Sequence, residues 1–241
     1  MSEAIYYDLR PAGRLAPSLA SQLARELGRK IVSGAYPPGQ LIEDEDALAT
    51  HFEVSRSVVR EAVKILAGKG LLTTRRGVGT RVQPRDRWGL LDDDVLAWHQ
   101  SIAPSMDYLR QLMDIRSALE PRAARWAAER GEEDDIAEIK KALQGMKDTQ
   151  ETVEAFVMAD ALFHRAIMKA ARNEFLTSLE GVINSALLAS IRLTNRNPLT
   201  NEESIPFHEE VCDAIAARDG HLAEIKMESL LGDTQQRLQA L

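Results

Sequence analysis

The apolar residues in the first third of the chain recur at intervals of three and four, the spacing of one face of an α-helix. This pattern predicts three helices, over about 19–32, 44–52 and 56–69. Each is preceded or begun by a residue whose side chain can accept a hydrogen bond from the first turn. These candidate N-caps are Ser18, Asp44 and Ser55.

A β-hairpin follows the third helix. Gly70 ends that helix, because the residue after a helix often takes a positive φ. Residues 71–76 and 80–82 then flank the glycine-rich turn Gly77-Val78-Gly79, and both flanks carry strand-forming side chains. The segment 83–91 contains proline, glycine and charged residues, and we interpret it as a linker.

Beyond this linker only helical spacing remains. It predicts helices at about 92–100, 105–129, 132–149, 152–171, 174–195, 201–218 and 220–240. Pro121 is expected to kink the second of them. We therefore expect a mainly α protein in which a helix-turn-helix domain with a small β-hairpin (1–86) is joined to an all-α antiparallel helical bundle (92–241).

Composition narrows the class of protein. Hydrophobic residues make up 44% of the chain and aromatic residues only 5%, which suits helical cores built from aliphatic side chains. No run approaches the ~20 apolar residues that a membrane span needs, and the N-terminus lacks an export signal, so we expect a cytoplasmic protein without membrane contact. The single cysteine, Cys212, excludes an intrachain disulfide and a thiolate-rich zinc site.

The charge is distributed unevenly. Residues 1–87 carry 14 Lys and Arg against 10 Asp and Glu, a net charge of +4. The remaining residues, 88–241, carry 16 against 27, a net charge of −11. This asymmetry indicates a basic domain that binds a polyanion, joined to an acidic domain with another role.

The third predicted helix has a cationic face. Arg56, Arg60 and Lys64 follow one another at intervals of four, and Ser57 lies in the first turn. A short helix, a tight turn and such a helix are typical of the helix-turn-helix that binds DNA. The hairpin adds candidate contacts to phosphates or to the minor groove at Arg75, Arg76 and Arg81. The alternative is a solvated helix face with scattered arginines.

Three motifs resemble those of GntR-type winged-helix transcription regulators. They are the first-helix exit Ile31-Val32-Ser33-Gly34-Ala35-Tyr36-Pro37-Pro38-Gly39, the recognition helix Val54-Ser55-Arg56-Ser57-Val58-Val59-Arg60-Glu61-Ala62 and the wing Gly77-Val78-Gly79-Thr80-Arg81-Val82. The helical part resembles the ligand-sensing FCD-type domain of the FadR subfamily.

The resemblance implies that the protein is a homodimer. It also implies that Arg56, Arg60, Arg76 and Gly77 contact operator DNA. The sequence departs from the family at Glu43-Asp44, where the family often has Pro-Ser.

A candidate metal site lies in the helical part. Asp160 and His164 are four residues apart on one otherwise apolar helix face, and His208 repeats this pattern on a later helix. A carboxylate and two imidazoles suit a divalent metal such as zinc, nickel or manganese. The alternative is an Asp–His hydrogen bond within the core.

The resemblance bears on this ligand set. Related sensing domains bind a metal through an Asp-x-x-x-His pair and two later histidines, which Asp160, His164 and His208 match in part. The fourth position falls near Leu230 and Ser229, without a histidine, and His221 is expected to face water. Such a site leaves room for water or for oxygens of an effector, or the metal is lost and His208 binds the effector directly.

The candidate effector is an organic acid. Arg116 lies among apolar neighbours and could bind a carboxylate, although an ion pair with Glu120 is equally consistent with its position. Further candidate contacts, which would suit an anion with several hydroxyl groups, are Asn184, Ser185 and Arg192. The segment 87–98 resembles the post-linker segment of family members that respond to aldonates or uronates.

Together these features predict a homodimeric transcription repressor whose operator binding is controlled by a sugar acid, with the linker 83–91 as the hinge. One alternative is a metal-dependent hydrolase that uses Asp160, His164 and His208. Another is a DNA-binding protein that responds to no ligand.

Overall fold

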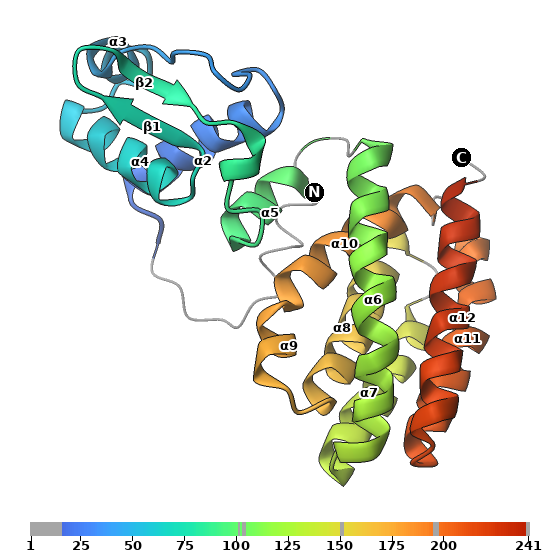
Figure 1. The fold of residues 1–241 in the computed structure, drawn as a ribbon. Coiled ribbons are helices and arrows are strands. Elements are labelled where there is room, and N and C mark those ends of the chain that lie inside the picture. Colours follow the sequence, from blue (N-terminus) through green and yellow to red (C-terminus); the bar gives the residue numbers. More distant parts are fainter. Residues whose placement is uncertain (1–15, 101, 103–104, 150–151, 195–197, 240–241) are drawn as a thin grey trace. The chain divides into compact units, whose positions relative to one another are not determined.

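The computed structural model forms two compact units, Met1–Ala103 and Pro104–Leu241 (Figure 1). The backbone is described for residues 16–100, 102, 105–149, 152–194 and 198–239. Within these ranges, side chains are not described at positions 154, 190–194, 198–202 and 239.

The described part of the first unit begins with three helices that the sequence predicted. They are α2 (Leu19–Val32), α3 (Glu45–His51) and α4 (Arg56–Gly68). The side chains of Ser18, Asp44 and Ser55 accept hydrogen bonds from first-turn N–H groups, as expected of N-caps. The apolar faces of α2 and α4 pack against each other and form the core of this unit.

A small antiparallel sheet follows α4. Strand β1 (Leu72–Arg75) pairs with β2 (Gly79–Val82), and the turn between them uses positive φ angles at Gly77 and Gly79. The other edge of β2 is also paired: the Ile42 N–H donates to the Thr80 carbonyl at 3.0 Å. Both edges of β2 are thereby bonded, which fixes the hairpin onto the unit as a wing.

The segment that we interpreted as a linker is packed onto the first unit. It contains a short 3₁₀ helix, η1 (Arg85–Arg87), and its ends are bonded to the chain around β1. The Gln83 N–H donates to the Leu71 carbonyl at 2.8 Å, and the Gly89 N–H donates to the Lys69 carbonyl at 2.8 Å. These hydrogen bonds make the segment part of the folded first unit. They argue against the hinge that we expected within residues 83–91.

Helix α5 (Asp93–Gln100) also belongs to the first unit, whereas the sequence placed it in the second. Trp98, which is 2% exposed, packs directly on Gly28 of α2, where a Cβ atom would lie 2.3 Å from the indole ring. The Lys69 ammonium contacts Asp92 at 2.7 Å and Asp94 at 2.9 Å. The boundary is therefore later than expected, because α5 buries its apolar face against α2.

The second unit is an all-α bundle (Figure 1). Its helices are α6 (Met106–Arg130), α7 (Glu133–Asp148), α8 (Val153–Ala170), α9 (Glu174–Ser178), α10 (Glu180–Thr194), α11 (Pro198–Ala216) and α12 (Gly220–Gln239). Helix α8 packs against α6, α7 and α10, and α6 packs against α12.

Two details of this unit differ from the prediction. The helix expected over 174–195 is interrupted at Leu179, which closes α9 before α10 begins. Helix α11 starts at Pro198, earlier than expected; proline suits a first helical position, where no N–H is needed. In the described part of the chain, no helix combines the length and the apolar character needed to cross a membrane.

Candidate functional site

The outer face of α4 is cationic, as the sequence predicted. The side chains of Arg56, Arg60 and Lys64 are 66%, 63% and 75% exposed. Ser57 is also exposed, and its hydroxyl lies 2.8 Å from that of Ser55, the N-cap. Val59 and other apolar residues of α4 are buried on the opposite side, so the core orients these polar side chains outward.

Two carboxylates that the sequence analysis did not single out contact this face. Glu45 Oε2 lies 2.6 Å from the Arg60 Nε atom, and Asp46 Oδ1 contacts the Arg56 Nε atom. Both acidic residues are in the first turn of α3, which packs against α4. Only the packing of the two helices reveals these partners, because each pair is separated by at least ten residues in the sequence.

The wing presents exposed cations at its tip. Arg75 and Arg76 are exposed beside Gly77. Arg81 differs from them, because its Nη1 atom donates to the Gly39 carbonyl within the unit. The first unit therefore presents cations on both α4 and the wing, as duplex DNA with its regularly spaced phosphates would require.

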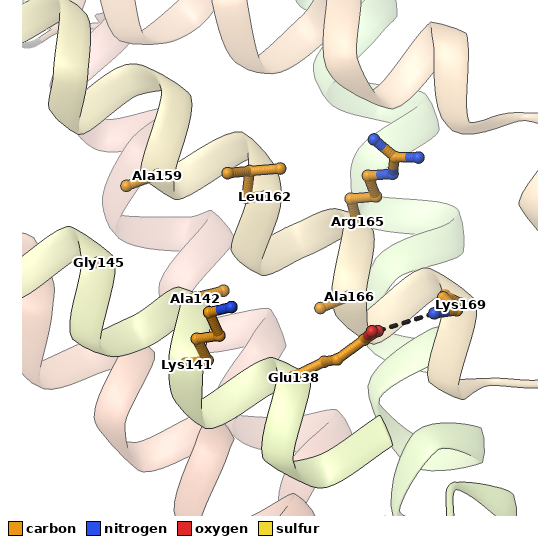
Figure 2. A pocket seen from close by; sticks show the side chains of 9 residues that line it. All are labelled: Glu138, Lys141, Ala142, Gly145, Ala159, Leu162, Arg165, Ala166 and Lys169. Atoms are coloured by element: carbon orange, nitrogen blue, oxygen red, sulfur yellow. Dashed lines mark hydrogen bonds and ion pairs between the residues drawn. The ribbon is translucent and has the colours of Figure 1, made fainter. Parts of the chain in front are cut away.

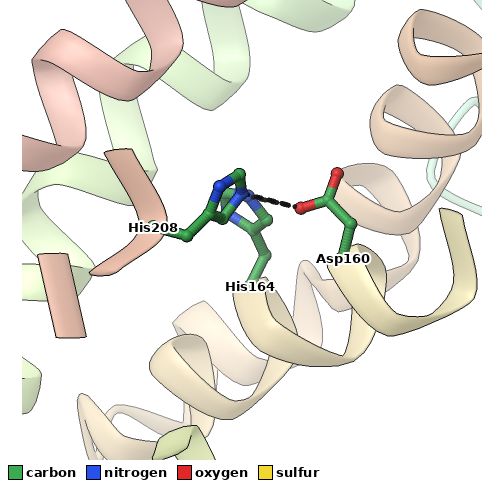
Figure 3. A group of neighbouring side chains, drawn as sticks. All are labelled: Asp160, His164 and His208. Atoms are coloured by element: carbon green, nitrogen blue, oxygen red, sulfur yellow. Dashed lines mark hydrogen bonds and ion pairs between the residues drawn. The ribbon is translucent and has the colours of Figure 1, made fainter. Parts of the chain in front are cut away.

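The second unit contains a buried polar cluster. Asp160 and His164 of α8 and His208 of α11 point toward one another (Figure 3), and all three are at most 6% exposed. Asp160 Oδ1 lies 3.0 Å from His208 Nε2 and 3.3 Å from His164 Nε2. The structure thus brings together the three residues that the sequence predicted as metal ligands.

The orientation of the His208 ring defines which atom faces Asp160. His208 Nδ1 lies 2.8 Å from the Ser204 carbonyl, and since a carbonyl can only accept, Nδ1 carries the proton. In a neutral imidazole the Nε2 lone pair then faces the Asp160 carboxylate, and two acceptors repel each other. The contact at 3.0 Å is favourable when a proton lies between the two atoms or when a metal ion is bound at Nε2.

His164 lies between two carboxylates. Its Nδ1 atom is 2.6 Å from Glu120 Oε2, although this atom has no hydrogen-bond partner of suitable angle among the described residues. Burial alone would lower the pKa of His164, but the charge of Glu120 and the hydrogen bond to Asp160 outweigh it and raise the pKa to about 9. An imidazole in this position binds a proton more strongly than a free imidazole does.

Arg116 and Glu120 of α6 extend this cluster. Arg116 Nε donates to Glu120 Oε1 at 2.6 Å, and Arg116 Nη2 lies 3.4 Å from His164 Nε2. Arg116 therefore faces inward and forms the ion pair with Glu120 that the sequence analysis gave as one of two alternatives. Burial would raise the pKa of Glu120, but Arg116 and His164 lower it to about 2.

The formal charge of this cluster is unbalanced. Arg116 contributes one positive charge, and Glu120 and Asp160 contribute two negative charges, so neutral imidazoles leave a net charge of −1 in the interior. A buried unbalanced charge is costly. A proton on one histidine would bring this net charge to zero, whereas a divalent metal ion would bring it to +1.

The two separations measured from Asp160 Oδ1 also fit a metal ion. Nitrogen and oxygen ligands at about 2.1 Å from a metal lie about 3.0–3.4 Å from each other. Asp160 Oδ1 is 3.0 Å and 3.3 Å from the two imidazole Nε2 atoms, as this arrangement requires. Leu230 is buried and Ser229 is exposed at the position of the missing fourth ligand, and His221 faces water as expected.

The predicted effector contacts are described only in part. Asn184 and Ser185 of α10 are both buried. The Asn184 amide donates to Glu180 at 3.4 Å, whereas its buried Oδ1 atom has no hydrogen-bond partner among the described residues. The side chain of Arg192 is among those that the structure does not describe. Cys212 is buried and is not part of the cluster.

A surface groove of about 530 Å³ lies between α7 and α8 (Figure 2), away from the residues that the sequence singled out. Lys169 and Glu138 form an ion pair of 2.8 Å at one end of it. The residues that line it are Glu138, Lys141, Ala142, Gly145, Ala159, Leu162, Arg165, Ala166 and Lys169. It contains none of the polar cluster.

A winged helix-turn-helix with a cationic helix, followed by a separate helical bundle, defines a DNA-binding transcription regulator. The sequence model of the bacterial regulatory proteins of the gntR family matches residues 19–82. The model of the FCD domain matches residues 111–233. The chain belongs to the GntR family of bacterial regulatory proteins, in the branch with a C-terminal FCD domain.

Named relatives cover nearly the same length. The galactonate operon transcriptional repressor of Escherichia coli (strain K12) is 33% identical over 216 residues, which are 89% of this chain and 94% of that protein. The regulator LutR of Bacillus subtilis (strain 168) is 32% identical over 82% of this chain and 90% of its own. Because the relatives and both domains are those of transcription regulators, this chain is a regulator and not an enzyme.

Solved structures share the fold. A GntR protein of Streptococcus agalactiae has a TM-score of 0.51 at 27% identity and covers 90% of this chain and 99% of its own. Lar, which controls the expression of the Listeria monocytogenes agr system, has a TM-score of 0.68 at 19% identity, with 95% and 100% covered. At this identity the second likeness shows the fold alone.

Proposed function

We propose that this chain is a transcription repressor whose operator binding is controlled by a sugar acid, an aldonate or a uronate, bound at the polar cluster of the second unit. The observation that carries the proposal is the contact of 3.0 Å between His208 Nε2 and Asp160 Oδ1, which a metal ion bound at Nε2 would stabilise. The likeness to a galactonate operon repressor supports the effector class and the direction of control.

A divalent metal is the cation that we assign to this site. Asp160, His164 and His208 would bind it, and Glu120 would orient His164 from behind through Nδ1. When bound, the metal would supply a positively charged centre, and carboxylate and hydroxyl oxygens can be its ligands. With the metal the cluster carries a net charge of +1, which a monoanionic sugar acid neutralises.

The remaining effector contacts would come from α6 and α10. Arg116 offers guanidinium hydrogens beside His164, and Asn184 has an unpartnered buried oxygen that suits a hydroxyl group. Ser185 and Arg192 on the same helix, α10, complete the set that we assign to the effector.

We assign operator contacts to the cationic face of α4 and to the wing. They are Arg56, Ser57, Arg60, Lys64, Arg75, Arg76, Gly77 and Arg81. In a homodimer two such wings and helices would bind the two halves of a palindrome. Such a regulator meets its operator in the cytoplasm.

The DNA-binding part of the proposal is tested with fluorescence anisotropy at near-physiological salt, on DNA from upstream of the protein's own gene and on a scrambled duplex. Replacing Arg60 by alanine is expected to weaken operator binding about tenfold or more, because one arginine contact to a base carries that much discrimination. Operator affinity equal to that of the wild type would reject α4 as the contacting helix.

The effector class is tested by adding a panel of aldonates and uronates to the wild-type complex. Release of the operator by one acid is the expected result. Tight operator binding that no acid disturbs would keep the regulator and reject the sugar acid. Equal binding to operator and scrambled duplex, with no acid response, would favour a DNA-binding protein without a ligand.

The metal site is tested by elemental analysis of the purified protein and by titration of metal-free protein with Zn²⁺, Ni²⁺ and Mn²⁺. His164→Ala and the isosteric Asp160→Asn are expected to lose metal and acid response, because each removes one of three ligands. His221→Ala, which changes an exposed histidine, is the matched control. Full metal content and a normal acid response in both cluster variants would reject the site.

A further inference from the structure

Four consecutive carboxylates, residues 43–46, precede and begin α3, and each has a different partner. Glu43 accepts a hydrogen bond of 2.8 Å from the Tyr36 hydroxyl. Asp44 caps the helix by accepting from the Asp46 and Ala47 N–H groups. The first two carboxylates therefore have structural roles, and the roles of Glu45 and Asp46 remain to be explained.

Glu45 and Asp46 reach the neighbouring helix. The Glu45 carboxylate contacts Arg60 and the Asp46 carboxylate contacts Arg56, in both pairs through the Nε atom. These arginines are one turn apart on the exposed face of α4 and remain 63% and 66% exposed. A guanidinium that pairs through Nε keeps its two Nη atoms for a further partner, and these are suited to a two-point contact with guanine or phosphate.

Stability does not account for these pairs. All four side chains are at least 42% exposed, and ion pairs in water contribute little to the free energy of folding. Acidic groups beside a DNA-binding face also oppose the phosphate charge, so they weaken DNA binding in general. Their position points to a role in selecting the DNA.

We propose that Glu45 and Asp46 determine the specificity of DNA binding by positioning the guanidinium groups of Arg60 and Arg56. This inference rests on the proposed contact between α4 and operator DNA. The carboxylates restrict the arginines before binding, which favours the geometry that the operator requires. Their negative charge weakens contacts with other duplexes, where no base contact compensates for it. Both effects enlarge the ratio of operator affinity to non-specific affinity.

The test measures this ratio with the full-length protein. The operator is obtained by selection from random duplexes with the wild-type protein, and a scrambled duplex of equal length is the non-specific probe. Affinities are measured by fluorescence anisotropy over a series of salt concentrations. The variants are Glu45→Gln and Asp46→Asn, which keep the shape and remove the charge.

Glu61→Gln is the matched control. Glu61 is an exposed carboxylate on α4 that pairs with Lys64 at 3.5 Å, so this variant loses one negative charge without releasing either arginine. It is expected to strengthen binding to both duplexes by a similar factor. Asp46→Glu keeps a carboxylate near Arg56 and is expected to restore part of the specificity that Asp46→Asn loses.

For Glu45→Gln and Asp46→Asn we expect the affinity ratio to fall about threefold to tenfold, with tighter binding to the scrambled duplex and no gain on the operator. Thermal unfolding should be nearly unchanged. Ratios equal to that of Glu61→Gln would overturn the proposal and leave charge alone as the cause. Unaltered operator binding in Arg56→Ala and Arg60→Ala would instead reject the contact between α4 and DNA.

Discussion

At the scale of single residues, burial sets the charge state of His99. This side chain of α5 is 4% exposed; its Nδ1 atom donates to the Val95 carbonyl at 2.8 Å, and its Nε2 atom faces Arg85 Nη2 at 3.4 Å. Burial and, to a smaller extent, the charge of Arg85 lower the pKa of His99 to about 4. The neutral ring satisfies both contacts, and protonation would place a second cation beside Arg85.

This arrangement predicts a loss of stability in acid. Between pH 6.5 and about 4 the unfolded chain binds a proton at His99 that the folded chain does not, so the free energy of unfolding falls as the pH falls, by at most about 3 kcal/mol. His99→Gln should show a smaller decrease. Urea unfolding at several pH values from 7 to 4 measures the free energy of unfolding of both proteins. An equal decrease in the two proteins would contradict the lowered pKa of His99.

Single residues also show where prediction from the sequence succeeds. Asp160 and His164 could be assigned to one site because a spacing of four on a helix puts them on the same face. Glu120 was considered only as a partner of Arg116, since nothing in the sequence shows that α6 brings it to His164. Glu45 and Asp46 were missed for the same reason: their partners lie on another helix.

At the scale of elements, short sequence motifs such as N-caps predicted where helices begin, but they did not predict which helices pack against each other. N-caps such as Ser18 and Asp44 act on the adjacent turn, so the sequence identifies them directly. The break at Leu179 carries neither glycine nor proline and could not be foreseen. The assignment of α5 to the first unit depends on the contact between Trp98 and Gly28, which are seventy residues apart in the sequence.

Gly28 is therefore expected to tolerate no side chain. In Gly28→Ala the new Cβ would lie 2.3 Å from the Trp98 ring, so α5 or α2 must move, at a cost of about 1–3 kcal/mol. Gly68→Ala in α4 is the control, because no atom lies within 4 Å of the added Cβ; we expect no loss and up to about 1 kcal/mol of gain. Equal stabilities in urea unfolding would contradict the packing of α5.

At the scale of the whole molecule, the two units have separate cores and opposite net charge. A ligand bound in the second unit can therefore control DNA binding by the first only if the ligand and the operator each favour a different state of the protein. Residues 83–100 are packed on the first unit, and they would move with the DNA-binding helices as one body.

Such coupling is reciprocal. If a sugar acid weakens operator binding by a given factor, saturating operator must weaken acid binding by the same factor, typically about 5- to 150-fold. Isothermal titration of the acid into the free protein and into the protein–operator complex measures the factor for the acid, and operator titrations with and without the acid measure the factor for the operator. Unequal factors would show that a further species, such as released metal, takes part in the equilibrium.

The positions of the tryptophans provide an optical consequence. Trp88 and Trp98, which are 7% and 2% exposed, belong to the first unit, and Trp126 on α6 is the third tryptophan of the sequence. In a Trp126→Phe protein all indole emission would arise from the DNA-binding unit, whereas the acid is proposed to bind in the other. A shift of that emission on adding the acid would then show that binding in the second unit changes the environment of the tryptophans in the DNA-binding unit, without any label or DNA in the cuvette.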